Sequence, residues 1–222
     1  DIAADPIRVP TDLVIVLAVS GSMSEVLPRA DSPSAEDTRF TVAKQAVLQL
    51  SESVLSQDRN NRISIIVFST GVNAALAFSS DKEAINGFVS GLSIGGFTNY
   101  ESGLNQAEAF LSGRTGAEIE RTSSVVLITD GQPNRGDALA GANRLKSNTN
   151  ADLYCVGIQS GASELLHTLA TDDSHFRDCA TADEFMEYMS QVTRQLSLVQ
   201  SATIWPGIGS GFNLFCSEAY PI

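Results

Sequence analysis

Two hydrophobic patterns alternate along the chain, and together they predict an α/β fold. Short and nearly unbroken apolar runs are typical of strands that are covered on both faces. Strand patterns of this kind, some of them short, occupy residues 13–19, 63–68, 73–78, 123–129, 153–158 and 176–179. Between them, apolar residues recur at the spacing of one helix face. This spacing predicts helices over residues 40–54, 82–92, 101–111, 138–147, 165–169 and 182–198.

The alternation of strands and helices also predicts how the elements are arranged. Helices of this length between strands indicate parallel strand–helix–strand units wound on both faces of one sheet. A hairpin signal around Thr70 and Gly71 adds one antiparallel edge strand. We therefore expect a doubly wound, mostly parallel, Rossmann-like sheet in a domain over residues 1–199. Residues 200–222 are rich in glycine yet apolar, and they form either a tail packed on the domain or the start of a truncated segment.

Composition and charge exclude several classes of protein. The 222 residues include 14 Lys and Arg against 26 Asp and Glu, a formal net charge of −12, and 43% of them are hydrophobic. This hydrophobic content is too high for an intrinsically disordered chain. The acidic balance leaves no basic face for nucleic acid and disfavours anionic membrane surfaces. Because the longest apolar run is far shorter than the roughly 18 residues of a membrane-spanning helix, we expect no direct membrane insertion.

The cysteines and the start of the chain say little about the compartment. Cys155, Cys179 and Cys216 are widely spaced and match neither a zinc pattern nor a redox pair. They are either buried thiols that behave as small apolar residues or include one disulfide between Cys179 and Cys216. The chain has neither an initiating Met nor a basic leader pattern, so we expect a processed or excised fragment whose targeting is not visible.

Oxygen-bearing side chains gather where an α/β sheet binds ligands, outside the carboxyl ends of its strands. Ser20 and Ser22 follow the first strand, Thr98 lies in a Gly-rich loop before a helix, and Asp130 follows the strand at 123–129. Hydroxyl and carboxylate oxygens suit Mg²⁺, Mn²⁺ or Ca²⁺. The sequence therefore predicts a divalent-cation site formed by Ser20, Ser22, Thr98 and Asp130. Such an incomplete coordination shell leaves one position for a carboxylate of another molecule.

The same residues carry a resemblance to the von Willebrand factor type A domain, called the I domain in integrins, over roughly residues 12–198. The metal-ion-dependent adhesion site of that family combines an Asp-x-Ser-x-Ser loop after the first strand, a Thr in a Gly-rich loop, and an Asp-Gly after a central strand. Ser20 and Ser22 match the two serines, Thr98 the threonine and Asp130 the aspartate. Three separated motifs in the right order make the resemblance specific.

One position departs from the pattern of the family, because Ala18 stands where the leading aspartate is expected. The change removes one of two carboxylates near the ion. At 4 Å, two opposite charges attract by about 4 kcal/mol even with surface-like screening, so we expect the ion to bind weakly or not at all. Ala18 is either a deliberate knock-out or natural variation in a domain that binds through its loops without metal. The intact remainder of the motif favours the first explanation.

The resemblance implies a non-enzymatic adhesion module at the cell surface or outside the cell, in which the cation takes an acidic group of a partner protein. The alternative is an intracellular A-type domain that assists the assembly or remodelling of a protein complex. Catalysis has little support, because neither His167 nor His175 accompanies a nucleophile elbow. A nucleotide site has little support either, since no Gly-Lys-Ser/Thr follows the loop glycines Gly95 and Gly96.

Most of the singled-out residues also have ordinary structural interpretations. Ser20 and Ser22 fit a helix-cap or turn cluster, and Thr98 to Glu101 fit a capping box in which Thr98 is the helix N-cap. The segment 135–137 spells Arg-Gly-Asp, an integrin-binding tripeptide. Because Gly-Asp directly before a helix is an expected cap, the structural interpretation is preferred for Asp137.

Overall fold

A single mixed sheet of six strands forms the centre of the protein, and its order is β3-β2-β1-β4-β5-β6. The computed structural model describes residues 9–29 and 37–200. The strands are β1 (Thr11–Ala18), β2 (Arg62–Phe68), β3 (Val72–Ser79), β4 (Thr122–Thr129), β5 (Asp152–Ile158) and β6 (Phe176–Cys179). All neighbouring strands pair in parallel except β3, which pairs antiparallel with β2 at one edge. The predicted fold class, including its antiparallel edge strand, is confirmed.

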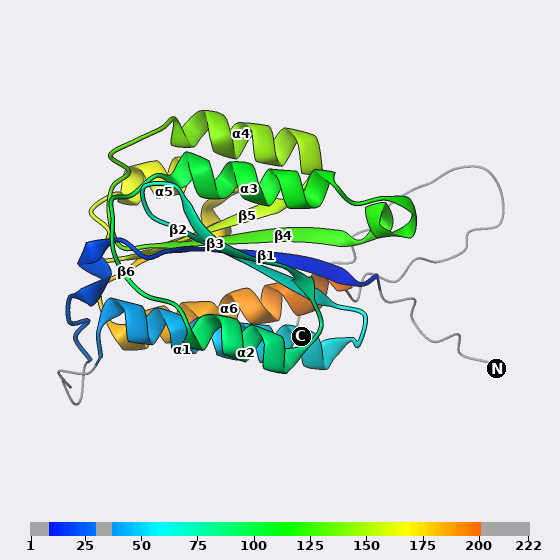
Figure 1. Cartoon of the computed structure of the whole chain (residues 1–222), viewed down its shortest axis with the longest axis horizontal. Coiled ribbons are helices and arrows are strands. Elements are labelled where there is room, and N and C mark those ends of the chain that lie inside the picture. Colours follow the sequence, from blue (N-terminus) through cyan, green and yellow to red (C-terminus); the bar gives the residue numbers. More distant parts are fainter. Residues whose placement is uncertain (1–8, 30–36, 201–222) are drawn as a thin grey trace, which may run out of the picture.

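Helices cover both faces of this sheet (Figure 1). One face carries α3 (Tyr100–Ser112), α4 (Ala138–Thr149) and α5 (Ser163–Leu169). The opposite face carries α1 (Arg39–Gln57), α2 (Lys82–Ser90) and α6 (Ala182–Gln200). The sequence pattern did not predict the short 3-10 helices η1 (Gly21–Ser24), η2 (Gly116–Glu120) and η3 (Asp173–His175). Such single turns are too short to show a hydrophobic period.

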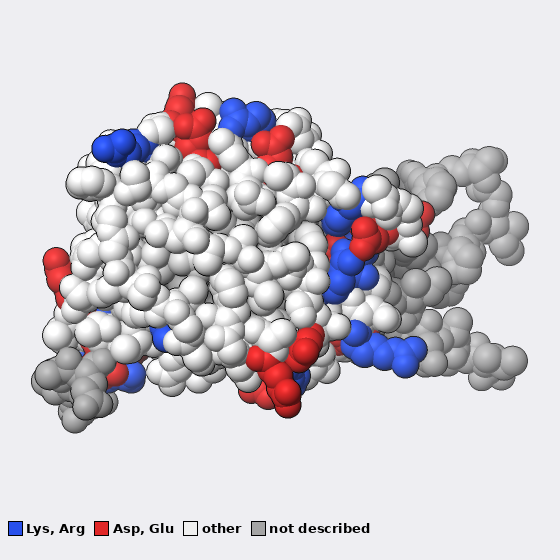
Figure 2. All heavy atoms as spheres, in the orientation of Figure 1, with Lys and Arg blue, Asp and Glu red and all other residues white. Residues whose placement is uncertain are grey.

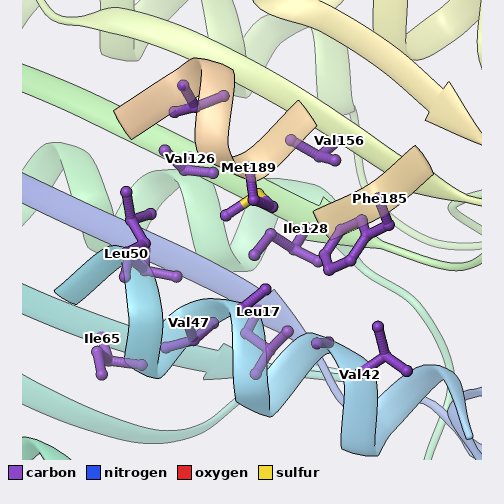
Figure 3. Close-up of a cluster of buried hydrophobic side chains, with 14 of the residues drawn as sticks. Leu17, Val42, Val47, Leu50, Ile65, Val126, Ile128, Val156, Phe185 and Met189 are labelled. Carbon is purple, nitrogen blue, oxygen red and sulfur yellow. The ribbon is translucent and has the colours of Figure 1, made fainter. Parts of the chain in front are cut away.

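The central strand β1 is buried along its whole length, since none of its residues is more than 2% exposed. Its side chains alternate between the two helical layers, as the pleat of a strand requires. Residues 13, 15 and 17 join the layer of α1 and α6, whereas residues 14, 16 and 18 join the layer of α3 and α4. Figure 3 shows Leu17 in one cluster with Val42 of α1 and Phe185 of α6. Burial on both faces explains why the sequence of β1 is continuously apolar.

Two of the three cysteines lie within the described residues. Cys155 on β5 and Cys179 on β6 are buried, as expected for thiols that pack as small apolar groups. Burial raises the pKa of both thiols, that of Cys179 to about 12. Cys216, the proposed disulfide partner, lies outside the described residues, as does the predicted tail beyond Gln200. Within the part of the chain that the structure describes, no helix is both long and apolar enough to cross a membrane.

One carboxylate, Asp12, is fully buried at the beginning of β1. Arg62 of β2 donates two hydrogen bonds to it, from Nε at 2.9 Å and from Nη2 at 2.8 Å. Arg121, which precedes β4, donates from Nε at 2.7 Å, and Arg114 from Nη1 at 3.3 Å. Figure 2 shows basic and acidic atoms side by side at this end of the molecule. Asp12 therefore ties the beginnings of β1, β2 and β4 together.

The ionised form of Asp12 is favoured in spite of its burial. Desolvation alone would raise the pKa of this carboxyl, but the hydrogen bonds from Arg62 and Arg121 and the positive charges of these two side chains together outweigh it, and the pKa lies below its ordinary 3.8. A group whose pKa is lowered by folding stabilises the folded state above its unfolded pKa. This contribution is lost as the pH falls through the lower, folded pKa.

Replacing Asp12 with Asn should lower the free energy of unfolding at pH 7 by about 3–5 kcal/mol, because it removes the buried carboxylate that three largely buried arginine side chains share. The two proteins should begin to converge in stability as the pH falls below the unfolded pKa of Asp12, and should finish converging as it falls through the lower folded pKa, where the carboxyl becomes protonated. Urea denaturation across this pH range measures both effects. As a control, Glu52→Gln removes an exposed pair with Lys82 and should change stability little. Equal losses in the two variants would contradict the special role of Asp12.

Candidate metal-ion-dependent adhesion site

The register of two parallel strands brings Ser20 and Asp130 together. Leu17 of β1 pairs with Ile128 of β4, so the residues that follow each strand emerge side by side. Ser20 Oγ donates a hydrogen bond to Asp130 Oδ1 at 2.8 Å, and Ser22 Oγ lies 3.3 Å from Ser20 Oγ. The Asp130 side chain is 0% exposed. Direct side-chain contacts therefore join three of the four predicted site residues.

Ser20 does not act as a side-chain cap of a helix, which was one structural interpretation of these serines. Ser20 directly precedes η1, but its side chain makes no capping hydrogen bond there. Its hydroxyl is directed to Asp130 instead. The serine cluster is thus part of a contact between two strand ends.

The Gly-rich loop before α3 is joined to the segment that follows β1. Gly95 N donates to the Val19 carbonyl at 2.7 Å, and Gly21 N donates to the Gly96 carbonyl at 3.3 Å. Gly96 has φ +91°, a conformation that side chains other than that of glycine rarely adopt. These backbone bonds hold the loop at the same edge of the sheet as Ser20.

Thr98, the fourth predicted residue, is held at this edge through its backbone. Its N–H donates to Asn134 Oδ1 at 3.3 Å, and its carbonyl accepts from Asn134 N at 3.0 Å. Thr98 is 5% exposed. The prediction that Thr98 caps α3 is wrong: Asn99 is the N-cap, and its side chain accepts from Ser102 N at 3.3 Å. The helix therefore begins at Tyr100, one residue later than the predicted capping box requires.

The loop after β4 is also connected to α3. The Tyr100 hydroxyl donates to the carbonyl of Gly131, directly after Asp130. The Tyr100 ring is fully buried and meets Phe68 edge to face at 6.1 Å. Burial raises the pKa of this phenol well above its usual range, so that it is a lasting donor. Tyr100 thereby fixes the loop that carries Asp130.

Sequence reasoning missed Arg39, which contributes a positive charge to this site. Arg39 Nη1 lies 3.4 Å from Asp130 Oδ2. Its Nη2 lies 2.8 Å from Glu25 Oε2 and donates to Gln159 Oε1 at 3.0 Å. A signal was available, because Arg39 is the first residue of α1 and no acidic residue lies in that first turn. A cation at the positive end of a helix dipole needs a counter-charge nearby.

The charges at this edge do not fit a divalent ion. Asp130 is the sole carboxylate among the four predicted ligands; one of its oxygens accepts from Ser20, and the other faces Arg39. Ala18 is 0% exposed, offers no oxygen, and belongs to the apolar cluster that contains Phe68. In residues 9–29 and 37–200, no group of three or more His, Cys, Asp or Glu could hold a metal ion. Hard cations need more negative charge than one arginine-paired carboxylate supplies.

Exposed apolar side chains lie close to this edge. Phe97, next to Thr98, is 57% exposed, and the guanidinium of Arg135 lies over its ring at 5.4 Å. Ile94 and Val72 are also exposed, and they line a hollow of about 340 Å³ between residues 69–73 and 93–96. These groups offer a surface that a protein partner could cover.

The tripeptide at 135–137 has the structural role that its position suggested. Asp137 is the N-cap of α4, and its side chain accepts from Ala140 N at 2.9 Å. Its own N–H donates to Glu101 Oε2 at 2.8 Å. The carboxylate of this tripeptide is therefore engaged by the helix.

A family comparison identifies the fold that carries these features. The model of the von Willebrand factor type A domain matches residues 12–195, which is most of the chain. The chain belongs to this family. A search of curated proteins found no match.

Several solved structures resemble this von Willebrand A-type domain. The vWF domain of the type V pili tip protein Mfa5 from Porphyromonas gingivalis superposes with a TM-score of 0.72 at 13% identity, over 93% of this chain and 100% of that chain. The pilus adhesin SpaC from Lactobacillus rhamnosus GG gives 0.71 at 17% identity, over 86% and 31%. Proximal thread matrix protein 1 of the mussel byssus, with a zinc-occupied MIDAS motif, gives 0.70 at 22% identity, over 87% and 50%.

Because all three sequence identities are low, these likenesses establish a shared fold and nothing further. The domain spans about a third of the SpaC chain and half of the mussel protein. The activities and partners of those longer proteins are therefore properties of those proteins and are not assigned to this domain.

Replacing Gly96 with Ala should destabilise the A domain by about 1–3 kcal/mol, because φ is positive and the new Cβ would lie 2.6 Å from Ser69 Oγ. Thermal and urea unfolding measure the loss. Gly71→Ala is the matched control in the neighbouring turn, since nothing lies within 4 Å of its added Cβ. A Gly96 variant as stable as the Gly71 variant would show that the loop is not held as described.

Proposed function

We propose that this domain is a non-enzymatic protein-binding module of an extracellular or cell-surface adhesion protein. Its binding surface is the edge formed by the loops after β1 and β4 and the loop before α3. One observation carries the proposal: side-chain contacts join Ser20, Ser22 and Asp130, and backbone bonds hold Thr98, at one edge of the sheet. Loops on a rigid sheet commonly carry binding sites.

The surface location is supported by the pilus proteins among the structural neighbours, Mfa5 and SpaC. The absence of catalysis is supported by the partners of the two histidines. His167 pairs with Asp173 and His175 with Asp172, in contacts of 2.8 Å and 2.7 Å. Neither of these contacts supplies a general base to Ser20 or Ser22.

The proposal includes a divalent-cation site that is impaired. Ser20, Ser22, Thr98 and Asp130 are the side chains that would hold Mg²⁺, Mn²⁺ or Ca²⁺, and the ion would take a carboxylate of the partner. Ala18 stands where a second carboxylate would complete the charge. The zinc-occupied MIDAS motif of the mussel protein supports the capacity of this fold to hold a divalent ion.

Calorimetric titration of Mn²⁺ should detect no binding to the chain as it stands and clear binding to Ala18→Asp. The aspartate adds a second negative charge at the position where the family motif carries one, and two carboxylates suit a divalent ion better than one. Ala18→Asn is the matched control, because it adds a similar volume without charge and should not bind. Firm binding by the unaltered chain would show that Ala18 is tolerated. Binding by none of the three would reject the cation site itself.

A photoreactive amino acid at position 97 should cross-link a partner protein on the surface of the source cells, because Phe97 is exposed beside Thr98. The same group at Glu120, which is exposed in η2 before the beginning of β4, is the control and should give no such product. Mass spectrometry of the products identifies the cross-linked chain. Equal cross-linking from both positions, or none from position 97, would contradict binding at the proposed edge.

A further inference from the structure

We propose that Arg39 is the resident cation of this edge. Its guanidinium takes the place of a divalent ion as the counter-charge of Asp130, so that the loops keep their conformation without a metal. The inference rests on the proposed function for what the edge does. The geometry that carries it involves Asp130, Arg39, Gln159 and Ala18.

Asp130 is a buried carboxylate. Its side chain is 0% exposed, and an ionised carboxylate out of contact with water must be paired with a positive charge. The hydrogen bond from Ser20 supplies no net charge. Arg39 Nη1, at 3.4 Å from Oδ2, is the cation that faces this carboxylate.

Arg39 itself occupies a position that is unfavourable for a positive charge. It begins α1, where the helix dipole repels a cation, and its side chain is only 10% exposed. Such a position is retained when specific partners hold the charge there. Asp130 supplies one of them and Glu25 the other, at 3.4 Å and 2.8 Å.

Gln159, a residue with a strained backbone, orients the guanidinium of Arg39. Gln159, directly after β5, has φ 48°, which is unusual for a residue other than glycine. Its Oε1 accepts from Arg39 Nη2 at 3.0 Å, and its Nε2 donates to the Ala180 carbonyl at 2.8 Å. The amide is thus fixed at both ends. Backbone strain at the residue that holds Arg39 indicates that this position of the guanidinium is specified.

The charges near Asp130 also disfavour a divalent ion. Ala18 contributes no negative charge, and Arg39 contributes a positive one. Both features act in the same direction, because each reduces the attraction for a divalent ion. Glu25, whose side chain is 60% exposed, contacts the same guanidinium. One side of Arg39 is therefore near the surface where a partner would bind.

Thermal unfolding of Arg39→Met, with and without Mn²⁺, tests the counter-charge. The unaltered chain should unfold at the same temperature in EDTA and in millimolar Mn²⁺. The variant should melt roughly 6–20 °C lower, because Asp130 loses its buried partner, and Mn²⁺ should recover part of that loss. Arg144→Met removes a more exposed arginine that pairs with Glu108 and should do neither. A stable, metal-indifferent Arg39→Met variant would overturn the inference, as would metal stabilisation of the unaltered chain.

Two further variants keep the inference testable if Arg39→Met does not fold. Arg39→Lys retains the charge and should remain insensitive to Mn²⁺. In the Ala18→Asp background, Arg39→Lys should leave Mn²⁺ affinity within about threefold, whereas Arg39→Gln should raise it at least tenfold, since about 1.4 kcal/mol of removed repulsion corresponds to that factor. Equal affinities for the Lys and Gln forms would overturn the inference.

Failure of this inference is distinguishable from failure of the proposed function. Cross-linking from position 97 reports on partner binding in the unaltered chain and requires neither metal nor a change at Arg39. If cross-linking succeeds while Arg39→Met is metal-indifferent, the binding edge stands and the counter-charge role falls. If cross-linking fails while Arg39→Met gains metal dependence, the reverse holds.

Discussion

Burial of the central strand on both faces restricts where the domain can place charge. β1 excludes water along its whole length, so a carboxylate at either end of it must find its counter-charge within the protein. Asp12, at the beginning, meets three arginines from different segments. Asp130, beside the opposite end, pairs with one arginine among the described residues, Arg39. The first arrangement fixes strand beginnings to one another, whereas the second lies among loops and leaves the hydroxyls of Ser20 and Ser22 beside the carboxylate.

The loops at the carboxyl edge act as one unit because backbone bonds connect them in sequence. The segment after β1 is bonded to the Gly-rich loop through Gly95, that loop is bonded to the segment after β4 through Asn134, and Tyr100 fixes Gly131 from α3. A displacement of any one loop would therefore be transmitted to the other two. The buried charge pair lies inside this network, so the conformation of the edge depends on how Asp130 is neutralised.

The fold and the meeting of Ser20, Ser22 and Asp130 at the edge could be predicted from sequence, because they follow from local pattern and parallel register. An apolar run predicts a buried strand, and parallel strands bring the residues that follow them, Ser20 and Asp130, to one place. The pairing of Arg39 with Asp130 could not be found in this way, since 91 residues separate the two and the contact joins the start of a helix to a loop. The N-cap of α3 was misplaced by one residue for a related reason. The backbone of Thr98 is occupied by Asn134, 36 positions away, and no local pattern encodes that bond.

A resident arginine and a bound metal would make different demands on a partner. A divalent ion attracts a carboxylate strongly and over a distance, but here the positive charge of Arg39 is balanced by Asp130 and Glu25, and the whole chain carries −12. Such a surface provides no long-range attraction for an acidic partner. Recognition would then depend on short-range contacts, and Phe97, Ile94 and Val72 supply exposed apolar area near the edge. With Arg39 as the resident cation that we propose, the edge would favour an apolar or aromatic partner surface over an acidic side chain.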